Sequence, residues 1–230
     1  MKLRRAISSL IATVLVGSAL GVAGAAPASA QEATVVSTYN SNGQWVYVSD
    51  SQQQPGMPVY GSQYYYNIVI QTAAGSAAIG SDAVTTLQRL DAGSSTWVTV
   101  DQATGPYLSG YTKALTSGTF RVTYSGNVNF AATSADSAYQ VQRKMSISNK
   151  GVRTVLLVGK VAPKYRGKVM ILKKAGKKWK TWKVVRTNKR SVFKTGLPAP
   201  RRGRYYWRAV IKPSGGFAAT DSGIFYTYKR

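Results

Sequence analysis

The sequence predicts an all-β protein built from two tandem antiparallel β-sandwiches that follow a cleaved signal peptide. Short runs of alternating apolar and polar residues, divided by turn-forming residues, recur along the chain, and no long stretch shows helical periodicity. The second half of the chain also repeats residue types of the first half. Because the chain has no cysteine, apolar burial alone has to hold each sandwich together.

Residues 1–30 have the three parts of a secretory signal peptide. A basic start is followed by an apolar stretch from Ile7 to Val22 and by the small-residue cleavage site Ala28-Ser29-Ala30. A membrane anchor is the alternative, but glycines interrupt the apolar stretch. We therefore expect a mature chain that begins at Gln31, has no transmembrane span, and is secreted, either extracellular or held non-covalently at the cell wall.

The internal repeat sets the expected domains. A shift of 85 positions aligns Leu87 with Leu172, Trp97 with Trp182, and Val122 with Trp207, and Phe-Ala-Ala-Thr occurs in both halves after two extra residues. We interpret this as a duplication, with an N-terminal domain over 31–142 and a C-terminal domain over 143–230. Each would be an antiparallel sandwich of immunoglobulin or fibronectin type, with a small barrel as the alternative.

The first strands of the N-terminal domain are expected at Trp45–Val48 and from Tyr64 onward, with a loop over 52–58. Tyr64-Tyr65-Tyr66 places rings on both faces of its strand. We expect aromatic core on one face and cross-strand pairing on the other, in preference to a ligand platform.

The expected strands of the C-terminal domain are short and separated by turn residues. They are 151–161, 168–174, 179–186, 191–197, 204–212 and 223–228. The second and third form a hairpin around a turn at Ala175–Gly176.

The repeated residues resemble the Ig-like β-sandwich repeats of secreted actinobacterial proteins. The resemblance rests on three shared patterns, namely L-[QK]-[RK]…W…V, then G-x-[FY]-x-[VW], then F-A-A-T…D-S. It implies a fold and a secreted setting, and it carries over no catalytic residues. Such modules serve as surface, adhesive or spacer units, so function has to be argued from the surface of these two copies.

Charge is divided very unevenly between the two expected domains. From Gln31 to Gln142 there are 3 basic and 6 acidic residues, whereas Arg143 to Arg230 holds 25 basic residues and a single acid, Asp221. Soluble surfaces usually mix both signs, because self-repulsion destabilises the folded state. The basic half therefore indicates an anionic partner. We expect the near-neutral N-terminal domain to contact a protein partner.

Catalysis is not expected. Without histidine or cysteine, the chain has no imidazole base, no thiolate and no usual zinc ligand set. The few carboxylates do not have the spacing of a calcium loop or mark a glycosidase pair. We predict a non-enzyme that needs no cofactor or metal. An unrecognised hydrolase, for instance one with a serine–lysine pair, is the least favoured alternative.

The expected polyanion-binding residues come from the basic hairpin, the turn region after it, and the strand that starts near residue 204. Lysines act as point charges for phosphate, and arginines beside a tyrosine pair with phosphate and stack on rings. The candidate residues are Lys173, Lys174, Lys177, Lys178, Lys180, Lys183, Arg186, Lys189, Arg190, Arg201, Arg202, Arg204, Tyr206 and Arg208.

The expected ligand is an anionic polymer of the cell envelope, such as teichoic acid, acidic polysaccharide or extracellular DNA. Sequence-specific nucleic-acid recognition is not expected, because no helix-turn-helix or zinc module is present. The competing hypothesis is a structural spacer or adhesin that makes protein contacts and uses its charge only for surface retention.

Overall fold

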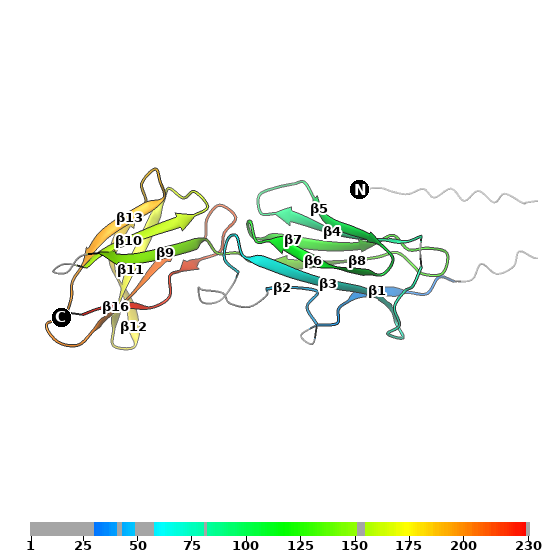
Figure 1. The fold of residues 1–230 in the computed structure, drawn as a ribbon, viewed down its shortest axis with the longest axis horizontal. Coiled ribbons are helices and arrows are strands. Elements are labelled where there is room, and N and C mark those ends of the chain that lie inside the picture. Colours follow the sequence, from blue (N-terminus) through cyan, green and yellow to red (C-terminus); the bar gives the residue numbers. More distant parts are fainter. Residues whose placement is uncertain (1–29, 41–42, 49–57, 81, 151–154, 229–230) are drawn as a thin grey trace, which may run out of the picture. The chain divides into compact units, whose positions relative to one another are not determined.

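The computed structural model describes residues 30–40, 43–48, 58–80, 82–150 and 155–228 (Figure 1). Within these residues the chain forms strands, turns and bends, and all pairing between the named strands is antiparallel. The all-β prediction is confirmed. The predicted signal peptide and the loop at 52–58 lie outside the described residues, except for Ala30 and Pro58. None of the described residues belongs to a helix that could span a membrane.

Two sheets make up the first half of the compact unit Gln31–Arg230. One contains β1 (Thr34–Ser37), β3 (Gln63–Thr72) and β2 (Val46–Val48), with β6 (Tyr107–Lys113) also paired to β3. The other has the order β5 (Val98–Thr104), β4 (Val84–Asp91), β7 (Gly118–Tyr124) and β8 (Thr133–Tyr139). One apolar core joins alternate residues of both sheets, among them Ile68, Leu87 and Val122.

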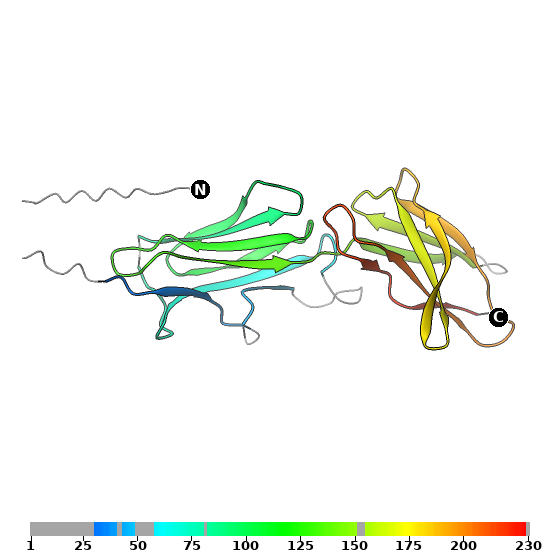
Figure 2. The ribbon, with the colours of Figure 1, turned by 180° about the vertical axis from the view of Figure 1, so that it is seen from behind.

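The second half has the same kind of two-sheet arrangement (Figure 2). One sheet contains β13 (Val192–Leu197), β10 (Val155–Ala162) and β9 (Lys144–Lys150). The other contains β12 (Lys178–Arg186), β11 (Lys168–Ala175), β14 (Tyr205–Ile211) and β15 (Thr220–Asp221), with β16 (Phe225–Thr227) also paired to β14. Its core includes Leu157, Ile171 and the fully buried Trp207.

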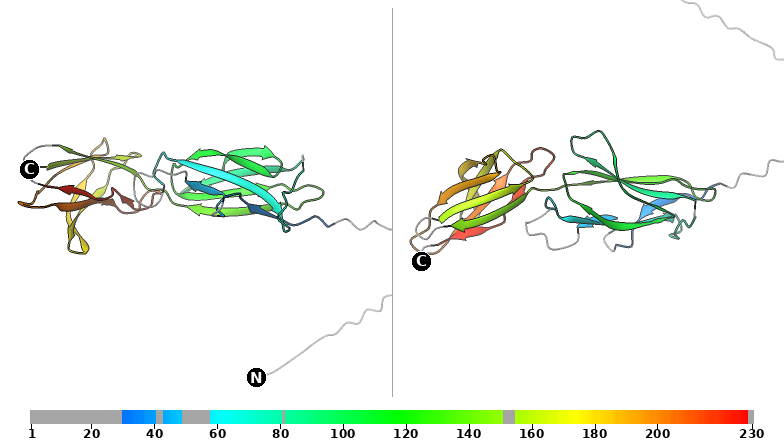
Figure 3. Two further views of the ribbon diagram at one scale, coloured as in Figure 1. Left: turned by 60° about the horizontal axis from the view of Figure 1, so that its bottom comes forward. Right: turned by 45° about the horizontal axis from the view of Figure 1, so that its top comes forward.

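The strand pairing of the first half recurs in the second. The central strands β4 and β11 each pair with the next strand of a hairpin and with the strand three elements later, β7 or β14. Both hairpins also carry a register shift at the same place, between Leu87 and Gln88 and between Ile171 and Leu172. Figure 3 shows the two hairpins from two further directions.

The register shifts correct the alignment of the two halves. They match Leu87 with Ile171, not with the expected Leu172, and Ile171 is fully buried like Leu87. Since side chains alternate between faces, an error of one residue places the wrong side of β11 in the core. On β14 the expected alternation is confirmed, because Trp207 and Ala209 are buried while Tyr206 is 38% exposed.

The tyrosine-rich start of β3 behaves as the sequence predicts. Tyr64 and Tyr66 are buried in the first core. Tyr65, on the other face, lies directly between Tyr47 on β2 and Tyr111 on β6, with ring centroids 5.1 and 4.9 Å away. Cross-strand packing of this kind contributes to sheet stability.

The turn of the basic hairpin lies one residue later than expected. Ala175 pairs with Lys178, so Gly176 and Lys177 form the two-residue loop. Gly176 has a φ of 61°, which suits the first position of a two-residue hairpin turn and which L-residues adopt only at a cost.

The corrected register of β11 makes a direct prediction about stability. Replacing the buried Ile171 by Ala should lower the free energy of unfolding of the second half by about 2–5 kcal/mol through cavity formation. Leu172→Ala, on the opposite face of the same strand, is the matched control and should cost about 1 kcal/mol or less. Urea unfolding followed by tryptophan fluorescence measures both, and a larger loss for Leu172→Ala would contradict the register.

Candidate functional site

The basic hairpin β11–β12 carries most of the predicted lysines, and its end extends past the strongly buried part of the core. Lys174, Lys177, Lys178 and Lys180 are exposed there. Lys173 differs, because its Nζ lies 3.4 Å from the ring centroid of Tyr205 and the residue is only half-exposed. A cation over an aromatic face keeps its charge while its position is fixed.

The predicted residues fall into two groups at opposite ends of the sheet. Lys173 pairs with Trp207, so the loop before β14, with Arg201, Arg202 and Arg204, ends beside the hairpin turn. Lys168 pairs with Arg186, so Arg186 and the following Lys189 and Arg190 belong to the other end. Six residues of strand separate Lys168 from Lys174, a distance of about 20 Å.

We call the group around the hairpin turn the turn-end cluster. It comprises Lys173, Lys174, Lys177, Lys178, Lys180, Arg201, Arg202, Arg204 and Tyr206. Lys183 pairs with Ile171, midway along the hairpin, and lies between this cluster and the Arg186 group.

Cations that were not among the predicted site residues lie elsewhere on the second half. Lys144, Lys160 and Lys194 are exposed on β9, β10 and β13, which form the opposite sheet. Lys164 and Arg166 are exposed in the connection between β10 and β11, toward the Arg186 end. Positive charge therefore covers both sheets. The turn-end cluster differs from these other exposed cations in having aromatic rings beside its own.

Arg208 has a structural partner that the sequence did not indicate. Its guanidinium lies 2.8 Å from the carboxylate of Asp221 and its Cζ lies 5.3 Å from the ring centroid of Trp179. The side chain is 28% exposed. Arg208 is thus held in place and its charge is balanced, which distinguishes it from the exposed arginines of the loop before β14.

The same arrangement occurs in the first half. Arg121 forms two hydrogen bonds with Asp136, at 2.7 and 2.8 Å, and its Cζ lies 4.2 Å from the ring centroid of Trp97. The register shifts make Trp97 the counterpart of Trp179, not of Trp182 as the 85-residue alignment expected. A correct strand register, applied to the sequence, would have revealed the repeated Trp–Arg–Asp group.

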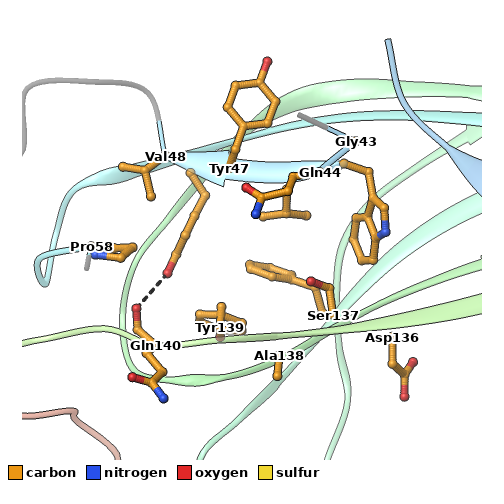
Figure 4. Close-up of a pocket in the computed structure, with 14 residues that line it drawn as sticks. Gly43, Gln44, Tyr47, Val48, Pro58, Asp136, Ser137, Ala138, Tyr139 and Gln140 are labelled. Atoms are coloured by element: carbon orange, nitrogen blue, oxygen red, sulfur yellow. Dashed lines mark hydrogen bonds between the residues drawn. The ribbon is translucent and has the colours of Figure 1, made fainter. Parts of the chain in front are cut away.

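A pocket of about 360 Å³ opens in the first half between β2 and β8 (Figure 4). Aromatic residues line it, and the Tyr64 hydroxyl donates a hydrogen bond of 3.3 Å to the backbone oxygen of Gln140. Burial raises the pKa values of Tyr64 and Tyr139. Asp136 is the one acidic residue among the described residues that line the pocket, and both of its oxygens bind Arg121.

The described residues contain no group of three or more His, Cys, Asp or Glu placed to hold a metal ion. The two Trp–Arg–Asp groups each contain one carboxylate in an ion pair, which leaves it poorly suited to proton transfer.

Comparisons with known proteins do not assign a family. No family model and no curated protein matches the chain. A solved structure of a DUF3823 family protein from Bacteroides uniformis aligns with 11% sequence identity and a TM-score of 0.25, over 76% of this chain and 100% of that one. A likeness at this level carries no argument about function.

The Arg121–Asp136 pair predicts a titration behaviour. Hydrogen bonds from Arg121 hold the pKa of Asp136 below its ordinary value of about 3.9. A carboxyl whose pKa is lowered by folding stabilises the native state above that ordinary value and loses the contribution as pH falls through its folded pKa. NMR titration of the carboxyl should show the low pKa in the natural protein and a higher one in Arg121→Gln. Identical titration curves would contradict the pairing.

Proposed function

We propose that this is a secreted, non-catalytic protein of the cell envelope whose basic second half binds anionic polymers electrostatically. The observation that carries the proposal is the composition of Arg143–Arg230, with 25 basic residues and one acid. That acid, Asp221, is in an ion pair with Arg208. The remaining cations therefore have no Asp or Glu of their own half to neutralise them, and a polyanion would relieve their mutual repulsion.

We further propose that the two halves are tandem immunoglobulin-like β-sandwiches that arose by duplication, with the boundary between Gln142 and Arg143. Three features support this interpretation: the recurrent strand pairing, the register shifts at matching positions, and the repeated Trp–Arg–Asp group. A framework shared by the two halves implies that the difference in surface charge was selected separately from the fold.

The setting of the proposal comes from the predicted signal peptide. Outside a cell, the dense anionic polymers are teichoic acid, acidic polysaccharide and extracellular DNA. Flexible lysines on a hairpin turn suit repeated phosphates or carboxylates without reading a sequence. The turn-end cluster is the proposed contact region, since it combines exposed lysines, a basic loop and aromatic rings.

A spacer or adhesin that contacts proteins is the second candidate, and the outer face of the β1–β3–β2 sheet with β6 favours it. Tyr107 and Tyr111 on β6 are 47% and 62% exposed, and Tyr39 is 67% exposed. Tyrosine is enriched at protein interfaces because it offers large contact area with little loss of side-chain freedom. In this alternative the second half would only retain the protein at the surface.

A charge-matched pair of variants tests the proposal. Replacing Lys177, Lys178, Arg201 and Arg202 by Gln should weaken binding to purified wall teichoic acid by about tenfold or more at low salt and reduce its salt dependence. The control replaces the same number of exposed cations elsewhere, Lys144, Lys160, Lys164 and Lys194.

The control variant should lose much less affinity, although its net charge falls equally. Equilibrium binding across a salt series measures both variants. Equal losses would show that total charge alone governs binding. An affinity of the natural protein that does not fall as salt rises would refute electrostatic binding altogether.

A further inference from the structure

We propose that the turn-end cluster is a binding site for single-stranded nucleic acid, a polyanion whose phosphates alternate with flat rings. This rests on the proposed polyanion function and narrows it to one ligand class. Three neighbouring tyrosines, two of them on the outer face of the sheet, form a row beside cations from two separate segments of the chain.

The row consists of Tyr206, Tyr226 and Tyr228. Tyr206 on β14 pairs directly with Tyr226 on β16, and their ring centroids are 6.3 Å apart. Tyr226 and Tyr228 are 6.0 Å apart. The three residues are 38%, 43% and 45% exposed. Tyrosine rings with this exposure can stack against another flat ring, and stacking buries apolar surface of both rings.

Two cations lie over rings of this row. The Cζ of Arg204 lies 4.5 Å from the ring centroid of Tyr226, and the Nζ of Lys174 lies 5.8 Å from that of Tyr206. Arg204 comes from the loop before β14 and Lys174 from β11, so the two cations reach the rings from different parts of the chain. A guanidinium stacked on a tyrosine keeps its edge free to donate to phosphate.

The one acidic side chain of the second half is Asp221, and its carboxylate is occupied by an arginine, Arg208. Asp221 pairs with Val210, four strand residues along β14 from Tyr206, which is about 13 Å. A phosphate at the row would therefore meet Arg204 and Lys174 and no carboxylate of the described part of this half.

The combination of tyrosine rings and cations favours some polyanions over others. A polymer of glycerol or ribitol phosphate presents charge and no flat ring. It would therefore contact the cations and gain nothing from the tyrosine rings. Each nucleotide brings a phosphate and a base, which suit a cation and a tyrosine in turn. Duplex nucleic acid keeps its bases stacked inside and offers no free ring face, so the single strand is the better fit.

The test uses the mature chain and two oligomers of equal charge. One is oligothymidylate of about 12 nucleotides, and the other has the same phosphodiester backbone with abasic sugars at every position. Polygalacturonate serves as a third probe, because its sugar rings could also stack. We expect oligothymidylate to bind at least about fivefold more tightly than the abasic oligomer at the same salt concentration.

Variants of the tyrosines test whether these rings cause the preference for oligothymidylate. Tyr206→Leu with Tyr226→Leu should lower oligothymidylate affinity to that of the abasic oligomer and leave abasic binding unchanged. Phe at both positions should retain the preference, which separates loss of a ring from loss of folding. Tyr111→Leu, which changes a more exposed tyrosine in the first half, is the control and should alter neither affinity.

The outcomes separate the two proposals. Equal binding of the two oligomers, tighter binding of polygalacturonate, or an unchanged preference in the Leu variant would overturn the nucleic-acid inference while electrostatic binding stands. Failure of all three probes to bind at low salt would overturn both the inference and the proposed function.

Discussion

Alternate burial of side chains between two sheets is the constraint on which the rest of this structure depends. The chain has no disulfide, so each half is held by the residues that point inward from its strands, such as Val122 in the first half and Ala209 in the second. Charges cannot share that interior without a large desolvation cost. The pleat therefore sends the lysines of β11 and β12 outward or past the end of the core, where they are available to a partner.

The two halves show how one framework of strands can carry surfaces of opposite net charge. Strand pairing, the bulge in the hairpin and the Trp–Arg–Asp group all recur, whereas the cations are concentrated in the second half. The repeated ion pair joins neighbouring strands on the outer face and fixes a tryptophan beside them. It belongs to the framework, so Arg208 differs in role from the exposed Arg201 and Arg202 even though all three are arginines of one segment.

Much of the fold can be predicted from the sequence because period-two patterns are local. The six strands expected in the second half start and end within a few residues of β10 to β14 and β16, whereas β9 and β15 were not expected. The tyrosines of β3 divide between core and surface as expected. The residue-by-residue alignment of the two halves could not be predicted in the same way. Ile171 and Leu172 are both apolar, so neither residue marks the core face by its composition. The bulge occurs in both halves, and the offset changes instead because the connection after Asp91 is longer than the one after Ala175.

The candidate site was predictable only in part for a related reason. Exposure of the hairpin lysines follows from charge alone, since burying them would be prohibitive. Their division from Arg186, Lys189 and Arg190 depends on which end of the sheet each loop reaches, and that follows from pairing between distant strands. The tyrosine row likewise depends on β14 pairing with β16, which no local pattern reveals.

The most direct measurement of the central claim is an NMR titration of the mature chain with purified wall teichoic acid, which follows every backbone amide. Shifts should concentrate at the turn of β11–β12 and in the loop before β14, and the first half should be unaffected. Shifts spread evenly over both sheets of the second half, or extending into the first half, would contradict the claim that a localised cationic surface binds the polymer.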